Sequence, residues 1–208
     1  MKNITLSYLF TRLVLISILT CMVTSCTITI NGNDYTKLNA EQRKLIKPFM
    51  IETTGNSVSY ETAYPLQEIN GNDIKECSKK YNYTWIYFWI PWCKGSISQL
   101  QYFIEIEKKY RDKGVKLLLV SLSYNVEDIK SVLSNTKFDR VSYILQASHY
   151  GQSINKSMKK VHTELSEGQN NIPKVKIASH YVFYNQTLIY CGDNFSEKDI
   201  QEIIAAHP

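Results

Sequence analysis

A single cysteine, Cys93, follows an apolar and aromatic run at residues 85–92 and precedes a segment with helical periodicity. The run is short and rich in the residues that strands prefer, so it predicts a buried strand. A thiol at a strand-to-helix junction lies beside unpaired backbone N–H groups and the positive end of the helix dipole. Both favour the thiolate, which is the nucleophilic form of cysteine. Cys93 is therefore the first candidate for chemistry, and an inert buried cysteine is the alternative.

Ser96 lies three residues after Cys93, about one helical turn further along. A hydroxyl is a poor nucleophile at neutral pH, so Ser96 cannot release a mixed disulfide as a second thiol would. It could instead donate a hydrogen bond to the Cys93 thiolate, and the charge of Lys94 would act in the same direction. The other interpretation is that Ser96 only caps the helix. The residues support a reactive thiol that does not resolve its own intermediate.

Two other cysteines, Cys77 and Cys191, lie beyond the N-terminal segment. Cys77 precedes the central strand, and a strand of about six residues would hold it roughly 20 Å from Cys93. A disulfide needs Cα atoms within about 7 Å, so Cys77 is predicted to be a packed core residue. If Asn185-Gln186 forms a two-residue turn, His180 lies opposite Cys191 on the paired strand. The alternative for this pair is a buried cysteine beside a surface histidine.

The remaining elements alternate between strands and helices. Strands are predicted at 58–62, 85–89, 115–122, 141–146, 180–184 and 187–191, and helices at 39–46, 66–81, 98–111, 126–135, 151–165 and 196–205. Gly71 marks either a break or the true start of the helix at 66–81. Residues 166–178 are polar and are predicted to be an inserted loop. Strand–helix alternation that ends in a hairpin and a helix predicts an α/β fold.

The segment around Cys93 resembles the active site of the thioredoxin superfamily, especially its membrane-anchored bacterial members. Those proteins carry a strand, an aromatic–x–x–Trp–Cys–x–x–Cys segment and a long helix. Trp89, Trp92 and Cys93 match, and Ser96 stands where the second cysteine of the family lies. The resemblance covers roughly residues 58–205 and rests on element order outside residues 89–93. It implies a thioredoxin-like fold: a central mixed β-sheet flanked by helices, here with an N-terminal extension.

The same resemblance implies thiol–disulfide exchange with protein or peptide thiols, with Cys93 and Ser96 as catalytic residues and Trp92 as a substrate contact. It also implies that the hairpin returns toward Cys93, so His180 and Cys191 become its possible neighbours. The family keeps a cis proline before the penultimate strand. Here the aligned place, Ala178-Ser179, has none, and Pro173 lies six residues earlier than Ser179.

The N-terminus has the pattern of a secretory signal peptide. Lys2 and Arg12 are its only charges, and no charged residue follows until after Ile30. Val23-Thr24-Ser25-Cys26 resembles a bacterial lipobox, which implies that Cys26 becomes a lipidated N-terminus and that residues 1–25 are removed. A weaker lipobox ends at Cys21, and the other alternative is an uncleaved membrane helix.

These patterns predict a signal peptide at 1–25, a lipid-anchored tether with a short helix at 26–57, and a thioredoxin-like domain at 58–208. Removal of the first 25 residues lowers the formal charge from +5 to +3, too little to indicate nucleic-acid binding. Phosphate loops, serine-hydrolase elbows and metal-ligand spacings are absent from the sequence, so no cofactor or metal is expected.

Two readings of the function follow. The first is a lipid-anchored monothiol oxidoreductase of the cell envelope that faces the periplasm or the exterior and takes part in thiol–disulfide exchange. The second is a binding lipoprotein without catalysis that uses its aromatic site to hold a peptide or partner protein. The retained Trp92-Cys93 junction favours the first reading. The missing second cysteine and the missing proline favour the second.

Overall fold

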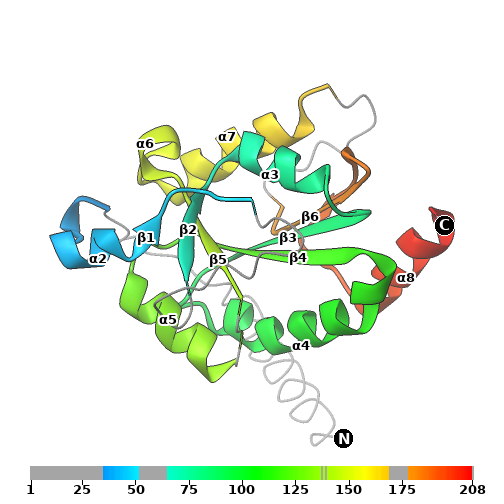
Figure 1. The fold of residues 1–208 in the computed structure, drawn as a ribbon, viewed down its shortest axis with the longest axis horizontal. Helices are drawn as coiled ribbons and strands as arrows, with labels where there is room; N and C mark the ends of the chain where they lie inside the picture. Colours follow the sequence, from blue (N-terminus) through cyan, green and yellow to red (C-terminus); the bar gives the residue numbers. More distant parts are fainter. Residues whose placement is uncertain (1–34, 52–64, 137, 139, 169–177, 208) are drawn as a thin grey trace, which may run out of the picture. The chain divides into compact units, whose positions relative to one another are not determined.

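A seven-stranded mixed sheet organises the chain (Figure 1), in the order β1-β2-β5-β4-β3-β6-β7. The computed structural model describes residues 35–51, 65–136, 138, 140–168 and 178–207. All of these belong to one compact unit, residues 33–208. The strands are β1 (Ile46–Lys47), β2 (Leu66–Ile69), β3 (Tyr83–Trp89), β4 (Val115–Ser121), β5 (Ser142–Leu145), β6 (His180–Tyr184) and β7 (Thr187–Gly192).

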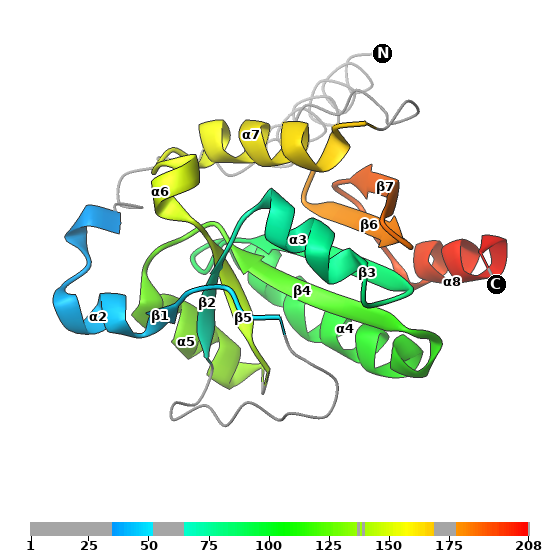
Figure 2. The same cartoon turned by 45° about the horizontal axis from the view of Figure 1, so that its top comes forward.

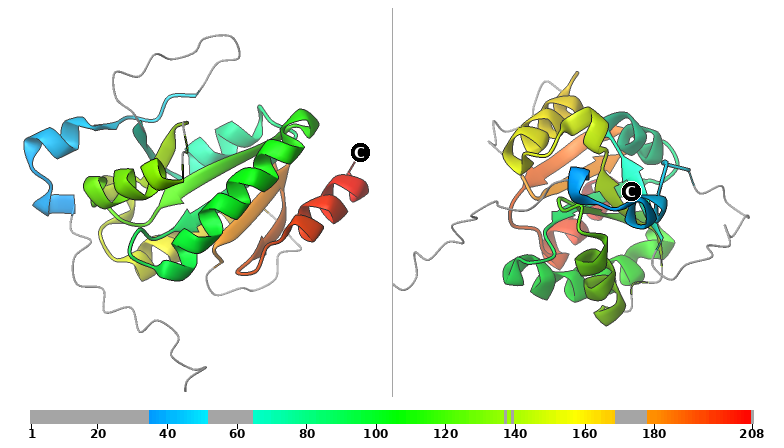
Figure 3. Two further views of the ribbon diagram at one scale, coloured as in Figure 1. Left: turned by 90° about the horizontal axis from the view of Figure 1, so that it is seen from below. Right: turned by 90° about the vertical axis from the view of Figure 1, so that its left-hand side faces the viewer.

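Helices cover both faces of this sheet. They are η1 (Tyr35–Lys37), α2 (Ala40–Lys44), α3 (Gly71–Ser78), α4 (Lys94–Tyr110), η2 (Arg111–Lys113), α5 (Val126–Asn135), α6 (Ala147–Tyr150), α7 (Ile154–Ser166) and α8 (Glu197–Ala206). Figures 1 and 2 show α3 and α7 on one face and α4 and α5 on the other. Seen from below in Figure 3, α4 runs along the sheet with α8 beside it.

The pairing pattern confirms the predicted fold class. Strands β1 to β5 pair in parallel, β6 runs antiparallel to β3, and β7 runs antiparallel to β6. The fold is therefore α/β, with a central mixed sheet flanked by helices in the thioredoxin-like order, and η1, α2 and β1 extend it at the N-terminal side. Parallel strands joined by helices must be covered on both faces, which explains why β3 and β4 are almost wholly apolar.

The central strand β3 divides the core between the two faces. All seven of its residues are buried. Because successive side chains alternate in direction, Trp85, Tyr87 and Trp89 point to the side of α4, where they pack with Leu100 and Phe103. This large aromatic cluster holds the end of β3 firmly against the start of α4.

The structure corrects the helix expected at residues 66–81. Leu66–Ile69 is strand β2, paired in parallel between β1 and β5, and α3 begins at Gly71 as the alternative held. The Asn70 side chain accepts the Asn72 and Asp73 backbone N–H groups and so starts the helix. Four residues are too few to show the alternation that identifies a strand. The pairing with β1 and β5, which forms this strand, cannot be read from its own sequence.

Other boundaries differ by a few residues. Ile46 belongs to β1 and not to the helix before it. The helix expected at 151–165 is α7, which begins at Ile154, and a separate short helix, α6, ends before Gly151, whose φ is +75°. The helices at 126–135 and 196–205 and both hairpin strands are confirmed to within a residue or two. The strand predicted at 58–62, Pro173 in the predicted loop and the N-terminal segment lie outside the described residues.

Candidate functional site

Cys93 lies where β3 passes into α4. The Leu122 N–H donates to the Trp89 carbonyl at 2.9 Å, and the Cys93 N–H donates to the Ile90 carbonyl at 3.1 Å. A tight turn at Pro91 and Trp92 thus delivers Cys93 to the N-cap position of α4, with an extended backbone at φ −88° and ψ 107°. The helix begins four residues before the predicted Ser98, which brings the thiol into its first turn.

The Cys93 thiol is half-buried at the positive end of a 17-residue helix. Its side chain accepts no capping hydrogen bond from the backbone N–H groups of the first turn. A thiolate at this position would gain from these N–H groups and from the helix dipole. The location matches the geometry that the sequence predicted for a reactive thiol.

The surroundings of the thiol include an exposed aromatic side chain. Trp92 is 44% exposed, although it directly follows the buried residues Ile90 and Pro91. Lys94 and Gly95 on the other side of Cys93 are also exposed, and a Cβ at Gly95 would lie 3.9 Å from the Cys93 Sγ. A large apolar surface beside a partly accessible thiol suits contact with a peptide.

Ser96 lies in the first turn of α4 and is partly buried. Within the described residues its hydroxyl makes no hydrogen bond to Cys93. Its backbone carbonyl accepts a hydrogen bond from the Tyr87 hydroxyl at 3.2 Å. The structure therefore links Ser96 to the strand below it through its main chain.

Tyr87 is a site residue that the sequence reasoning missed. It is 2% exposed, and burial raises its pKa, the bond to Ser96 lowers it, and the charge of a nearby Cys93 thiolate raises it. Its phenol therefore stays protonated, close to the thiol, and fixes the first turn of α4. The alternation Trp85-x-Tyr87-x-Trp89 along the strand would have revealed that it faces the helix.

His180 lies directly opposite Tyr87 in the antiparallel pair of β3 and β6. The two rings stack at 4.7 Å with 13° between their planes. The Trp85 indole N–H donates to His180 Nδ1 at 3.1 Å, which places the imidazole proton on Nε2. Nε2 is buried without a hydrogen-bond partner among the described residues.

The electrostatics of His180 keep it uncharged. Burial lowers its pKa from 6.5 to about 3, against a weaker opposing effect of Asp199. His180 is fully buried and stacked between Tyr87 and Phe195, so it supports the aromatic cluster under the site. A histidine that is neutral across the physiological range does not supply a positive charge to Cys93.

The expected pairing of His180 with Cys191 is wrong. The Asn185-Gln186 turn exists, with φ values of 43° and 75°, but the ladder between β6 and β7 has a β-bulge at Val182 and Phe183, before the turn. The bulge shifts the register by one residue, so Cys191 lies opposite Tyr181 and Gly192 lies opposite His180.

The same shift turns Cys191 toward the opposite face of the sheet from Tyr87 and His180. Cys191 is 7% exposed, and burial raises the pKa of its thiol, with a further rise from Asp193. Cys77 on α3 is 5% exposed, as predicted for a packed core residue. None of the three described cysteines forms a disulfide. Neither Cys77 nor Cys191 is placed to resolve a disulfide on Cys93.

Ala178-Ser179 is the place that aligns with the cis proline of the thioredoxin superfamily, and its backbone is held by regular hydrogen bonds. The Phe88 N–H donates to the Ser179 carbonyl at 2.9 Å, and the Ser179 N–H donates to the Asp193 carboxylate at 3.0 Å. The described peptide bonds are all trans.

Within the described ranges, no group of three or more His, Cys, Asp or Glu side chains could hold a metal ion. In the same ranges, no helix has the length and hydropathy needed to cross a membrane.

Comparison with solved structures finds proteins that are described as thioredoxin-like or as belonging to the thioredoxin family. A thioredoxin domain of a thiol-disulfide oxidoreductase from Bacteroides vulgatus is 15% identical, with a TM-score of 0.44 over 62% of this chain and 81% of that one. A thioredoxin-family thiol:disulfide interchange protein from Chlorobium tepidum is 10% identical, with a TM-score of 0.44 over 63% and 83%. A thioredoxin-like protein from Parabacteroides distasonis is 12% identical, with a TM-score of 0.43 over 61% and 82%.

Identities and TM-scores this low say nothing about the chemistry of this chain. No protein-family model matches the sequence. No curated protein matches it either. The argument for function therefore rests on the residues around Cys93.

Proposed function

We propose that the chain is an extracytoplasmic, lipid-anchored, thioredoxin-like protein whose single active thiol, Cys93, takes part in thiol–disulfide exchange with proteins or peptides. The observation that carries this proposal is the position of Cys93 at the N-cap of α4, half-buried beside the exposed Trp92. Structural cysteines lie deeper, as Cys77 and Cys191 do. The position of Cys93 instead meets the requirements of a reactive thiol: a helix N-terminus and partial access.

The proposed reaction conserves sulfur and electrons. The Cys93 thiolate attacks one sulfur of a substrate disulfide, a mixed disulfide forms, and the other substrate sulfur leaves as a thiolate. A thiol from outside the chain then attacks the mixed disulfide and releases Cys93. With a dithiol as the outside reductant, the substrate is reduced, the dithiol becomes a disulfide and Cys93 returns unchanged. Ser96 stabilises the thiolate in this scheme, and Trp92 contacts the substrate.

Alkylation rates test the reactivity of the thiol. In the native full chain at neutral pH, Cys93 should react with iodoacetamide at least about tenfold faster than Cys77 and Cys191, because the other two are buried and the pKa of Cys191 is raised. At mildly acidic pH, Cys93 should also react faster than free cysteine. Mass spectrometry of peptides sampled over time measures all three rates in one sample. Equal slow labelling of the three cysteines would contradict the enzymatic role.

The binding-protein reading remains the second candidate, and two observations favour it. No described cysteine is placed to resolve a disulfide on Cys93, and Trp92 is one of the few large apolar side chains exposed in the described chain. In this reading the aromatic surface holds a peptide or partner protein without covalent chemistry. Its signature would be partner binding that survives replacement of Cys93 by alanine and is lost with Trp92→Ala.

The proposed anchor has its own test. Cys26→Ala should leave the precursor uncleaved, or move the domain to the soluble fraction if another peptidase cuts it, because the thiol proposed to carry the lipid is removed. Fractionation of cell envelopes and mass spectrometry of the N-terminal peptide measure the outcome. Cys21→Ala is the matched control and should leave both lipidation and location unchanged. A wild-type protein with an intact N-terminus and no lipid would show that the lipoprotein proposal is wrong.

A further inference from the structure

The hydroxyl of Tyr87 lies against the first turn of α4, the turn that begins at Cys93. It donates to the Ser96 carbonyl at 3.2 Å, and Ser96 is the third residue after the N-cap. The Cys93 Sγ lies beside the same turn, because a Cβ placed on Gly95 would be 3.9 Å from the sulfur. The phenol hydroxyl and the sulfur therefore both approach the backbone of Gly95-Ser96, and the hydroxyl ties that backbone to the central strand.

The ring that carries this hydroxyl is tightly packed. It stacks on His180 of β6 at 4.7 Å, and Phe103 of α4 meets it edge-on at 4.8 Å and 73°. Tyr87 is only 2% exposed. A side chain enclosed in this way is confined to one rotamer, so the position of its hydroxyl is set by the fold. The bond to Ser96 therefore fixes the start of α4 relative to β3.

The titratable groups that meet at Tyr87 stay neutral when Cys93 ionises. Burial lowers the pKa of His180 to about 3, and Asp199 opposes this only in part. Burial also raises the pKa of Tyr87, and the charge of a Cys93 thiolate raises it further, whereas the bond to Ser96 lowers it. The phenol thus remains a hydrogen-bond donor, and it lies close enough to Cys93 for the two groups to interact. Lys94, the charged residue next to the thiol, is exposed.

We propose that Tyr87 is a positioning residue for the Cys93 thiolate, because its hydroxyl holds the first turn of α4 with the backbone N–H groups directed at the sulfur. This inference rests on the proposed role of Cys93 as the active thiol. An acceptor at the N-cap gains from the N–H groups of the second and third helical residues, and that gain depends on the orientation of the turn. Tyr87 acts through the Ser96 main chain, so its effect does not require the Ser96 hydroxyl.

Tyr87→Phe is the direct test, since it keeps the ring between His180 and Phe103 and removes only the hydroxyl. The rate of Cys93 alkylation by iodoacetamide, measured against pH in the full chain, gives the midpoint of thiol ionisation. In the variant this midpoint should rise by about half a pH unit, and the rate at about pH 6 should fall about threefold, as expected for the loss of one neutral hydrogen bond. Slow labelling of the buried Cys77 in the same sample shows that the variant is folded.

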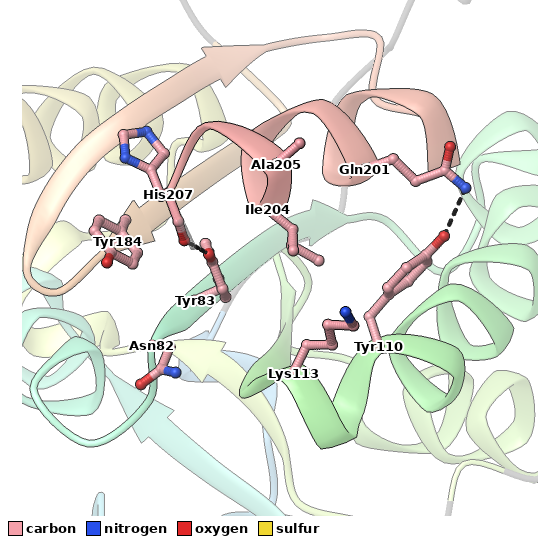
Figure 4. Close-up of a pocket in the computed structure, with 9 residues that line it drawn as sticks. All are labelled: Asn82, Tyr83, Tyr110, Lys113, Tyr184, Gln201, Ile204, Ala205 and His207. Carbon is pink, nitrogen blue, oxygen red and sulfur yellow. Dashed lines mark hydrogen bonds between the residues drawn. The ribbon is translucent and has the colours of Figure 1, made fainter.

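Tyr83→Phe is the matched control. Tyr83 lies on the same strand, is 3% exposed, and donates its hydroxyl to the His207 carbonyl in the wall of a pocket at the other end of β3 (Figure 4). Its replacement should leave the Cys93 midpoint unchanged. Ser96→Ala keeps the carbonyl that Tyr87 binds, so Tyr87→Phe should cause the same rise in the Ser96→Ala protein. A smaller rise there would mean that the effect passes through the Ser96 hydroxyl, and would overturn the proposal.

A second measurement leaves Tyr87 in place. The chemical shift of the Tyr87 Cζ carbon should change with pH at the midpoint found for Cys93, and it should stay constant over the same range in Cys93→Ala. A Cζ signal that does not follow Cys93 would overturn the proposal. Equal midpoints in wild type and Tyr87→Phe, with Cys93 still reactive, would overturn the role of Tyr87 and leave the proposed function standing. A wild-type Cys93 that labels as slowly as Cys77 would contradict both.

Discussion

Ser96→Cys is expected to convert the chain into a dithiol reductase. Positions 93 and 96 lie one turn apart at the start of α4, where the Cβ atoms of residues at this spacing are about 5–6 Å apart. A small adjustment brings them to the 3.5–4.5 Å that a disulfide requires. The second thiol then attacks the mixed disulfide within the same molecule. Because this step becomes intramolecular, reduction of insulin disulfides with dithiothreitol as donor should be about 100-fold faster than with wild type.

The wild type should stall at the mixed disulfide, which accumulates on non-reducing gels and disappears when a small thiol is added. Ser98→Cys is the matched control, since it adds a thiol to the same helix at an exposed position five residues from Cys93. It should not raise the rate. Wild-type turnover as fast as that of Ser96→Cys would mean that a resolving thiol exists, against the positions of Cys77 and Cys191 in the fold.

A third outcome separates the two functional readings. If Ser96→Cys forms its disulfide but gains no reductase activity, the thiols are competent and substrate docking is the missing part. The backbone at Ser179, which is bonded to Phe88 and Asp193, would then be the first place to examine. That result would favour the binding-protein reading, with Trp92 as its main contact.

The sequence predicted the elements whose signal is local. The buried run before Cys93, the helix at 126–135 and the hairpin turn at Asn185-Gln186 all rest on neighbouring residues, and the structure confirms them. A strand covered on both faces is apolar throughout, and a cap or a tight turn needs particular side chains at fixed positions. Short-range patterns of this kind can be read before any tertiary contact is known.

The features that escaped prediction depend on contacts between distant residues. Strand β2 has four residues and exists because β1 and β5 pair with it, so no period within Leu66–Ile69 could distinguish it from a helix start. The bulge in the hairpin moved Cys191 by one position, and that single residue decides which face its thiol occupies. Tyr87 gained its role from His180 across the sheet and from Ser96 above it.

The aromatic cluster beneath Cys93 should make the fold sensitive to acid through His180. The native state holds this imidazole neutral, with its pKa lowered to about 3, whereas the unfolded chain binds a proton below about pH 6.5. The stabilisation is therefore complete above pH 6.5 and is lost as the pH falls toward 3. Each pH unit in this window should cost about 1.4 kcal/mol of unfolding free energy, and the whole window about 5 kcal/mol. Urea unfolding of wild type and His180→Gln at pH 7.5 to 4.5 measures the loss.

Glutamine keeps an acceptor for the Trp85 indole and does not titrate. The difference between the two stability curves therefore cancels the contribution of the carboxylates that both proteins share. That difference should shrink by about 2.5 kcal/mol between pH 6.5 and 4.5. His180→Met lacks the acceptor for the Trp85 indole. Its difference from wild type should show the same pH dependence as that of His180→Gln, shifted by a constant offset. A difference curve that stays flat for both variants would mean that the pKa of His180 is the same in the folded and unfolded chain. The folded protein would then take up a proton at His180 below about pH 6.5, and the stacked cluster under the thiol would hold a positive charge there.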